Sequence, residues 1–146
     1  LAEIDIVLNE MKRVLKSEGK FVVNEMFSDV QSEPKNTYVK LHHFGAKIDR
    51  ILGDLHYETY TRRNIKQIIK NLDINIQDEF IYSHPSKELN QRETLNNLCK
   101  SIDKKVEQIK DKEEYNEIKE KSKILKKEIF DVGLSIPDHI MIIGTK

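Results

Sequence analysis

Apolar residues recur at helical spacing in the first fifteen positions of the chain. They are Ile4, Val7, Leu8, Met11, Val14 and Leu15. Their intervals of three and four residues predict an amphipathic helix over 3–15 with one apolar side. We expect Gly19 to end this helix in the left-handed conformation that favours glycine. The short apolar run after it predicts a strand over 20–25.

Three further elements are predicted in the middle of the chain. An apolar stripe predicts a helix over 37–52, which follows a polar loop over 28–36. Thr61 is a suitable N-cap for the next helix, which we expect to run to Leu72. Alternating apolar residues then predict a strand over 74–82.

The pattern changes between residues 86 and 131, where a short polar segment separates two apolar stripes. The stripes consist of Leu95, Leu98, Ile102, Val106 and Ile109, and of Tyr115, Ile118, Ser122, Leu125 and Ile129. Complementary stripes with a short link are typical of an antiparallel helical hairpin. Asp111 and Glu114 resemble a capping box at the start of the second helix, and Gly133 is expected to end that helix.

The last apolar run of the chain lies between Pro137 and Gly144. Its four consecutive apolar residues predict a strand over 139–145 that is buried on both faces. Helices alternate with strands along most of the sequence. This alternation predicts an α/β fold.

Composition and charge exclude several classes of partner and site. Lys and Arg total 25, as do Asp and Glu, so the neutral chain offers no electrostatic case for binding nucleic acid or an anionic membrane. A single cysteine excludes a disulfide framework and paired-cysteine sites. The apolar runs are too short to span a bilayer, and no signal peptide pattern opens the sequence. We therefore expect a cytoplasmic protein without a metal site.

Three segments of the sequence carry a family resemblance. Residues 10–19 read E-M-K-R-V-L-K-S-E-G before an apolar strand, residues 56–82 place a helix before the next strand, and residues 140–146 form a short terminal strand. In this order they resemble the C-terminal half of a class I S-adenosylmethionine-dependent methyltransferase, of the type 11-like kind. The resemblance implies a partial Rossmann-like sheet of the last three strands, with the final strand antiparallel between the other two.

The resemblance also implies how the chain is divided. Residues 1–83 and 134–146 are expected to form the C-terminal half of the methyltransferase domain, and residues 84–133 an inserted helical hairpin. The family binds its cofactor with a glycine-rich loop, and no GxGxG occurs here. S-adenosylmethionine is thus the cofactor of the complete enzyme, and we expect this chain alone not to bind it.

Candidate substrate-binding residues lie where the first strand ends. Ligands of open α/β sheets lie beyond the carboxyl ends of the strands, so Asn24, Glu25 and Phe27 are candidates. Glu25 could equally be a solvated loop acid. Tyr60 is a further candidate because an aromatic ring can hold a sulfonium by cation–π contact, although packing is the commoner role of such a tyrosine.

Three histidines are candidates for acid–base chemistry. His42 and His43 lie in the insertion that covers the substrate pocket in the resembled family, and His56 lies on the link back to the sheet. An imidazole near a pocket suits a general base, so His56 and His42 are candidate catalytic residues and His43 a candidate substrate-binding residue. Surface or core-edge roles remain the alternative for all three. Because adjacent helical residues point about 100° apart, at most one of His42 and His43 should face a given site.

Two functional hypotheses follow. The first is the substrate-side C-terminal portion of an S-adenosylmethionine-dependent methyltransferase that acts on a small-molecule acceptor. The second is a non-catalytic methyltransferase remnant that serves as an oligomerisation or interaction module. In both cases the edge of strand 20–25 and the apolar side of helix 3–15 lack partners, so we expect a homo-oligomer, most simply a twofold dimer, through one of these surfaces.

Overall fold

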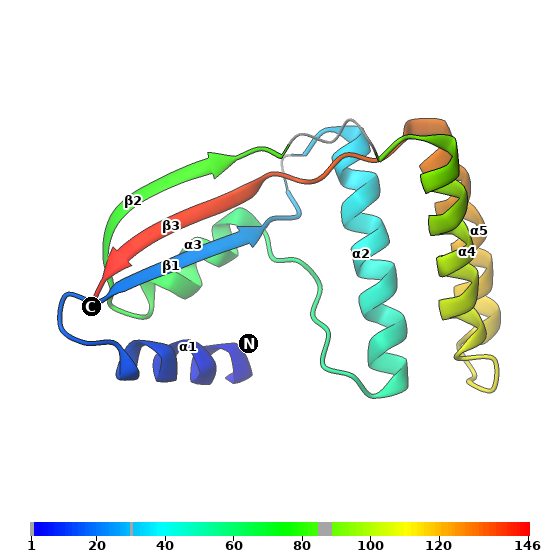
Figure 1. Cartoon of the computed structure of the whole chain (residues 1–146). Coiled ribbons are helices and arrows are strands. Elements are labelled where there is room, and N and C mark those ends of the chain that lie inside the picture. Colours follow the sequence, from blue (N-terminus) through cyan, green and yellow to red (C-terminus); the bar gives the residue numbers. More distant parts are fainter. Residues whose placement is uncertain (1, 30, 85–88) are drawn as a thin grey trace. The chain divides into compact units, whose positions relative to one another are not determined.

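The computed structural model describes residues 2–29, 31–84 and 89–146. The described residues form five helices and three strands (Figure 1). The helices are α1 (Ala2–Val14), α2 (Glu33–Leu52), α3 (Arg62–Lys70), α4 (Arg92–Glu107) and α5 (Tyr115–Val132), and the strands are β1 (Lys20–Met26), β2 (Asn75–Tyr82) and β3 (His139–Thr145). Their contacts define two compact units. The sheet unit comprises residues 1–29, 60–83 and 138–146, and the helical unit comprises residues 30–59 and 84–137.

The three strands form one sheet in the order β1-β3-β2. β3 is antiparallel to both neighbours: Val22 of β1 lies opposite Ile143, and Phe80 of β2 lies opposite Met141. β1 and β2 therefore run in the same direction on either side of the last strand. This confirms the predicted position and direction of the final strand, within a mixed fold of helices and strands.

One face of the sheet is covered by α1 and α3, which lie on the same side of it (Figure 1). The core between these layers consists of Phe21, Phe27, Ile65, Ile69, Leu72, Ile74, Ile140 and Ile142. α3 begins as predicted, because the Thr61 hydroxyl accepts a hydrogen bond of 3.2 Å from the backbone N–H of Asn64. The apolar core connects the strands to α1 and α3 in a single layer.

The opposite face of the sheet has no covering helix among the described residues of this unit. Its apolar side chains are Val22, Met26, Phe80, Tyr82, Met141 and Ile143. Val22 is 55% exposed and Phe80 43% exposed, while Met141 and Ile143 are half-buried. The prediction that the last strand is buried on both faces is therefore wrong for the sheet unit, since only one of its faces meets helices.

A β-bulge between Ile76 and Asp78 interrupts the pairing of β2 with β3. Gln77 is the extra residue. Because side chains alternate along a strand, this residue places Phe80 on the opposite face from Ile76. The alternation over 74–82 thus identifies the strand but not the residues that share a face.

Gly19 does not close α1 in the predicted way. The left-handed conformation belongs to Glu18, whose φ is 61°. Gly19 is required instead for space, because a Cβ atom there would lie 2.8 Å from the carbonyl oxygen of Lys16. The Gly19 N–H donates a hydrogen bond of 2.9 Å to that same oxygen.

α2 begins four residues before the predicted start. The predicted loop over 28–36 is too long, because Glu33 already belongs to the helix. Pro34 lies in the first turn, where its missing N–H has no partner to lose. The first turn is closed by a bond of 2.8 Å from Asn36 N to Ser32 O.

The start of α5 also differs from the prediction, whereas its end agrees. Glu114 precedes the helix without a capping side chain, so the predicted box with Asp111 is wrong. Gly133 ends the helix with φ 84° and ψ −176°. Beside it, Asn90 accepts a bond of 2.7 Å from Leu134 N and donates one of 2.8 Å to Leu134 O, which fixes the exit from the helix.

The helical unit packs α2 against both helices of the predicted hairpin. Its buried residues are Ile48, Leu95, Ile102, Val106, Ile109, Ile118, Leu125, Ile129 and Leu134. The predicted stripes of the hairpin therefore form this core, with Leu98 and Tyr115 partly buried at its margin. Residues 30–59 group with residues 84–137 in this unit, and the apolar side of α2 packs against α4 and α5.

Candidate functional site

The predicted site residues fall into both units. In the sheet unit, Glu25 and Tyr60 line a small pocket of about 130 Å³. Its other walls come from α1, β1 and α3, through Ile4, Leu8, Val23, Ile65, Ile68 and Ile69. Partial burial among these apolar groups raises the pKa of the Glu25 carboxyl. Glu25 is thus the one carboxyl group among the residues that line this mostly apolar pocket.

The other two strand-end candidates do not line this pocket. Asn24 lies on the opposite face of the sheet, where its Oδ1 is 3.0 Å from Nδ1 of His139. Phe27 is 2% exposed and belongs to the core, with the Arg62 guanidinium 5.8 Å from its ring centre. Alternation along the strand separates Asn24 from Glu25, and burial removes Phe27 from the surface.

In the helical unit, the three candidate histidines meet around the link that follows α2. Nδ1 of His56 lies 2.6 Å from Oδ2 of Asp49, and its Nε2 lies 3.2 Å from Nε2 of His42. Nδ1 of His42 is 3.3 Å from the hydroxyl of Thr59, and the backbone N–H of Thr59 donates to Nε2 of His43 at 3.1 Å. Both adjacent histidines therefore reach the same residue, which the predicted 100° separation did not anticipate.

We call the series Thr59, His42, His56 and Asp49 the histidine chain. An ionised carboxylate only accepts hydrogen bonds, so Nδ1 of His56 carries a proton and donates it to Asp49. When His56 is neutral, its Nε2 accepts, and Nε2 of His42 must donate to it. Nδ1 of His42 then accepts from the Thr59 hydroxyl. In this neutral arrangement, every imidazole nitrogen of the histidine chain has a hydrogen-bond partner.

The charges around the histidine chain keep Asp49 ionised and His42 neutral. Lys105 Nζ lies 2.7 Å from Oδ1 and 2.9 Å from Oδ2 of Asp49, and its hydrogen bond, with that of His56, lowers the pKa of the Asp49 carboxyl. Burial, and then the neighbouring His56, His43 and Lys105, lower the pKa of His42. A carboxylate at one end and a neutral imidazole near the other are the arrangement that acid–base chemistry uses.

A pocket of about 220 Å³ adjoins the histidine chain. His42 and His56 both line it, together with Leu41, Phe44, Gly45, Leu98, Ser101, Ile102 and Lys105. Most of its walls are apolar and come from α2 and α4. The two imidazoles, with Ser101 and Lys105, are therefore the polar groups of a mostly apolar lining.

The histidines of this site are expected from the sequence, whereas Asp49, Thr59 and Lys105 are not. Asp49 follows His42 by seven residues, two helical turns, and so lies on the same side of α2. That spacing is a signal that helical periodicity could have provided. Lys105 comes from α4, and no local pattern announces a contact between residues so distant in the sequence.

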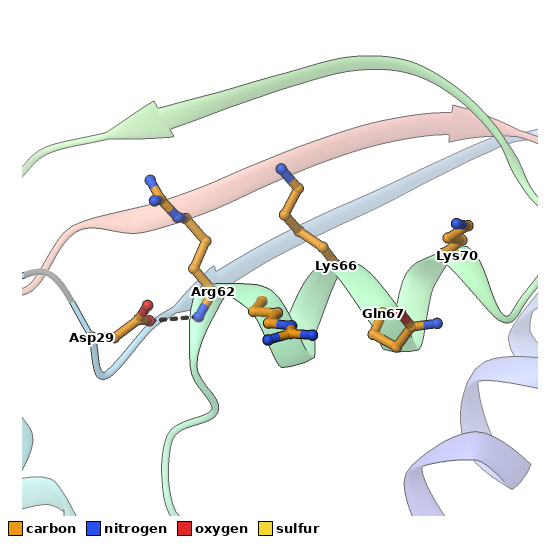
Figure 2. A pocket seen from close by; sticks show the side chains of 6 residues that line it. Asp29, Arg62, Lys66, Gln67 and Lys70 are labelled. Carbon is orange, nitrogen blue, oxygen red and sulfur yellow. Dashed lines mark hydrogen bonds between the residues drawn. The ribbon is translucent and has the colours of Figure 1, made fainter.

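α3 carries a row of cations that the neutral overall charge conceals. Figure 2 shows the open depression beside it, lined by Asp29, Arg62, Arg63, Lys66, Gln67 and Lys70. The Asp29 carboxylate accepts a bond of 2.6 Å from the Arg62 backbone N–H, and Lys66 pairs with Glu79 of β2 at 2.7 Å. The carboxylate of Asp29 therefore bonds the backbone and not a cation of the row, and a row of this kind is typical of a solvated helix face.

The glycines of this chain do not form a cradle for a cofactor. A phosphate or carboxylate cradle places glycine before a helix N-terminus. Gly19, Gly53 and Gly133 instead follow the C-terminal ends of helices, Gly45 lies within α2 and Gly144 lies within β3. None of the five glycines therefore precedes a helix N-terminus.

Cys99 is half-buried, and burial raises the pKa of its thiol. This agrees with a structural residue, since a nucleophilic cysteine needs a lowered pKa. In the part of the chain that the structure describes, no group of three or more His, Cys, Asp or Glu side chains is placed to hold a metal ion.

Comparisons with known proteins add no relative. The sequence matches no protein-family model, and its comparison with curated proteins gives no significant match. Within the described residues, every helix is too short or too polar to cross a membrane.

Proposed function

We propose that this chain is the substrate-side C-terminal portion of an S-adenosylmethionine-dependent methyltransferase with a small-molecule acceptor and a Rossmann-like sheet. The strand order carries the proposal. β3 lies antiparallel between two strands that run in the same direction, as the resemblance leads one to expect for the last three strands. The chain forms β1 and then β2, and β3 afterwards inserts between them.

The uncovered apolar surfaces of the sheet unit give further support. A three-stranded sheet with one open apolar face is small for an independent domain, and further strands and helices would cover it. On α1, Ile6 is 68% exposed and Val14 64% exposed. A larger sheet to which β1 contributes an interior strand would bury both kinds of surface.

The histidine chain suits the acid–base part of such a reaction. Methyl transfer is an in-line displacement that depends on alignment and exclusion of water. It needs a base only when the acceptor atom is protonated. His56, held by Asp49, and His42 are the groups that we assign to that task. The cofactor supplies the methyl group and is bound by residues outside this chain.

The proposal is tested with the complete product of the gene. We expect the reading frame to encode, before this segment, a strand followed by a glycine-rich loop. We also expect the complete product to transfer labelled methyl groups from S-adenosylmethionine to small molecules of the cell extract. A complete product without such a loop, and without transfer, would contradict the proposal.

The second hypothesis, a non-catalytic remnant acting as an oligomerisation or interaction module, is favoured by one observation. Ile6, Val7, Met11 and Val14 expose between 47% and 68% of their surface on α1, and such a surface commonly contacts another polypeptide. A complete product that forms stable oligomers but transfers no methyl group would favour this second function.

A further inference from the structure

The two facing imidazoles of the histidine chain point to a particular kind of ligand. We propose that the pocket beside His42 and His56 binds small apolar compounds that carry a hydroxyl group, with His56 accepting the hydroxyl proton. The pocket and both side chains lie within the helical unit. Binding is therefore a property of this chain, whereas the use of the bound oxygen as a methyl acceptor rests on the proposed function.

The pairing of a donor with an acceptor selects the hydroxyl. When both imidazoles of the histidine chain are neutral, Nε2 of His42 donates a hydrogen bond and Nε2 of His56 accepts one. A hydroxyl group can accept from the first and donate to the second at the same time. A carboxylate only accepts and an ammonium only donates, so each would leave one imidazole nitrogen without a bond.

The geometry allows one oxygen to reach both nitrogens. The two Nε2 atoms are 3.2 Å apart, so an oxygen at the usual distance of about 2.8 Å from each can bind both. The two rings are nearly perpendicular, at 85°, with their centres 4.9 Å apart. A ligand hydroxyl that binds both nitrogens would replace their direct hydrogen bond with two bonds of its own.

The other groups around His56 stabilise the charges that form when the proton is transferred. When the O–H bond breaks, an N–H bond forms at Nε2 of His56 and the electron pair stays on the ligand oxygen. The imidazolium of His56 then faces the carboxylate of Asp49 at 2.6 Å, and the oxygen accepts from Nε2 of His42. Lys105 holds Asp49 from the other side at 2.7 Å.

The walls of the pocket define the rest of the ligand. Leu41, Phe44, Leu98 and Ile102 make most of the lining apolar. The volume of about 220 Å³ lies below the range of about 300–1,000 Å³ that is usual for drug-sized ligands. A single ring with one hydroxyl, as in a phenol, matches both the size and the chemistry.

Titration calorimetry of the 146-residue chain with phenol and with anisole tests the proposal. The two rings have nearly the same shape, but the methyl ether cannot donate a proton. We expect saturable binding of phenol and binding of anisole weaker by about tenfold or more, the cost of one unmatched hydrogen bond. Absent phenol binding, or equal binding of both compounds, would overturn the proposal.

Three variants locate the binding. Ser101→Phe should block the pocket without touching the histidine chain, and His42→Ala should remove the preference for phenol over anisole. His139→Ala, on the sheet, is the matched histidine control and should bind as the unaltered chain does. Unaltered binding by Ser101→Phe would place the ligand elsewhere. Phenol binding by this chain without methyl transfer by the complete product would refute only the proposed function, and the reverse would refute only this inference.

Discussion

At the scale of single residues, His42 links the stability of the protein to pH. Its pKa is lowered, chiefly by burial, whereas in the unfolded chain it protonates near pH ~6.5. Below that pH the unfolded state therefore binds a proton that the folded state does not. The free energy of unfolding should fall as the pH decreases through about 6.5 and should level off once folded His42 also protonates. The lowered pKa of His43 acts in the same direction.

Urea unfolding at pH 7.5, 6.5 and 5.5 measures this dependence. The variant His42→Asn should show a shallower loss of stability over that range, because it lacks the group that titrates. A variant that loses as much stability between pH 7.5 and 5.5 as the unaltered chain would show that His42 is not the group responsible.

The two histidines should also control turnover in the complete enzyme. If His56 or His42 is the base, its replacement by alanine should lower turnover by ~10²–10⁴-fold while the protein stays folded. Methyl transfer and the thermal midpoint are measured side by side. Unchanged turnover in both variants would show that neither histidine acts as the base.

At the scale of elements, two glycines should respond to alanine with opposite signs. Gly133 has φ 84° and ψ −176°, a conformation almost confined to glycine, and a Cβ atom there would lie 2.9 Å from Oδ1 of Asn90. Gly133→Ala should lower the free energy of unfolding by about 1–3 kcal/mol. Gly45 lies inside α2, where alanine should raise it by about 0.5–1 kcal/mol because it restricts the unfolded chain.

Chemical denaturation of both variants beside the unaltered chain measures these changes. The Cβ atom of Gly45→Ala would meet only the flexible end of Lys105 at 3.4 Å, so it is the matched control. Equal destabilisation by both substitutions would mean that helix propensity and backbone conformation do not explain the two positions.

The elements show where sequence patterns succeed and where they fail. Long stripes, such as those of the hairpin, predict helices because burial requires regular spacing. The bulge at Gln77 changes the face of Phe80 through a single residue that leaves the alternation intact. The turn that follows α1 depends on Glu18, and the start of α2 depends on Pro34. Both features are local and do not follow from the periodicity of apolar residues.

The candidate site shows the same division. The chemistry of imidazole and the positions of the histidines in the predicted insertion and link identify them as candidates. In the structure His42 and His43 both contact Thr59, and His56 contacts His42. The partners that give them direction could not be found in the same way, since Lys105 belongs to another helix and approaches only when α2 packs on α4. Tertiary packing therefore determines the roles within the site.

At the scale of the whole molecule, the uncovered surfaces predict association of the isolated chain. Val7, Met11 and Val14 of α1 are exposed by 56%, 47% and 64%, and β1 is an edge strand. Burying each large side chain would contribute ~1.5–3 kcal/mol, and free strand edges recruit other chains. We expect an oligomer, most simply a twofold dimer, through the 20–25 edge or the 3–15 helix.

Sedimentation equilibrium at micromolar concentration measures this association. Met11→Lys should weaken a dimer formed through α1 and should leave one formed through the β1 edge unchanged. A stable monomer of the unaltered chain would contradict the prediction.

We propose that this chain carries the substrate side of a methyltransferase and that other residues of the complete gene product bind the cofactor. Isothermal titration with S-adenosylmethionine tests it most directly, applied to the 146-residue chain and to the complete gene product. We expect no saturable binding by the chain and micromolar binding by the complete product. Saturable binding by the chain, or none by the complete product, would contradict it.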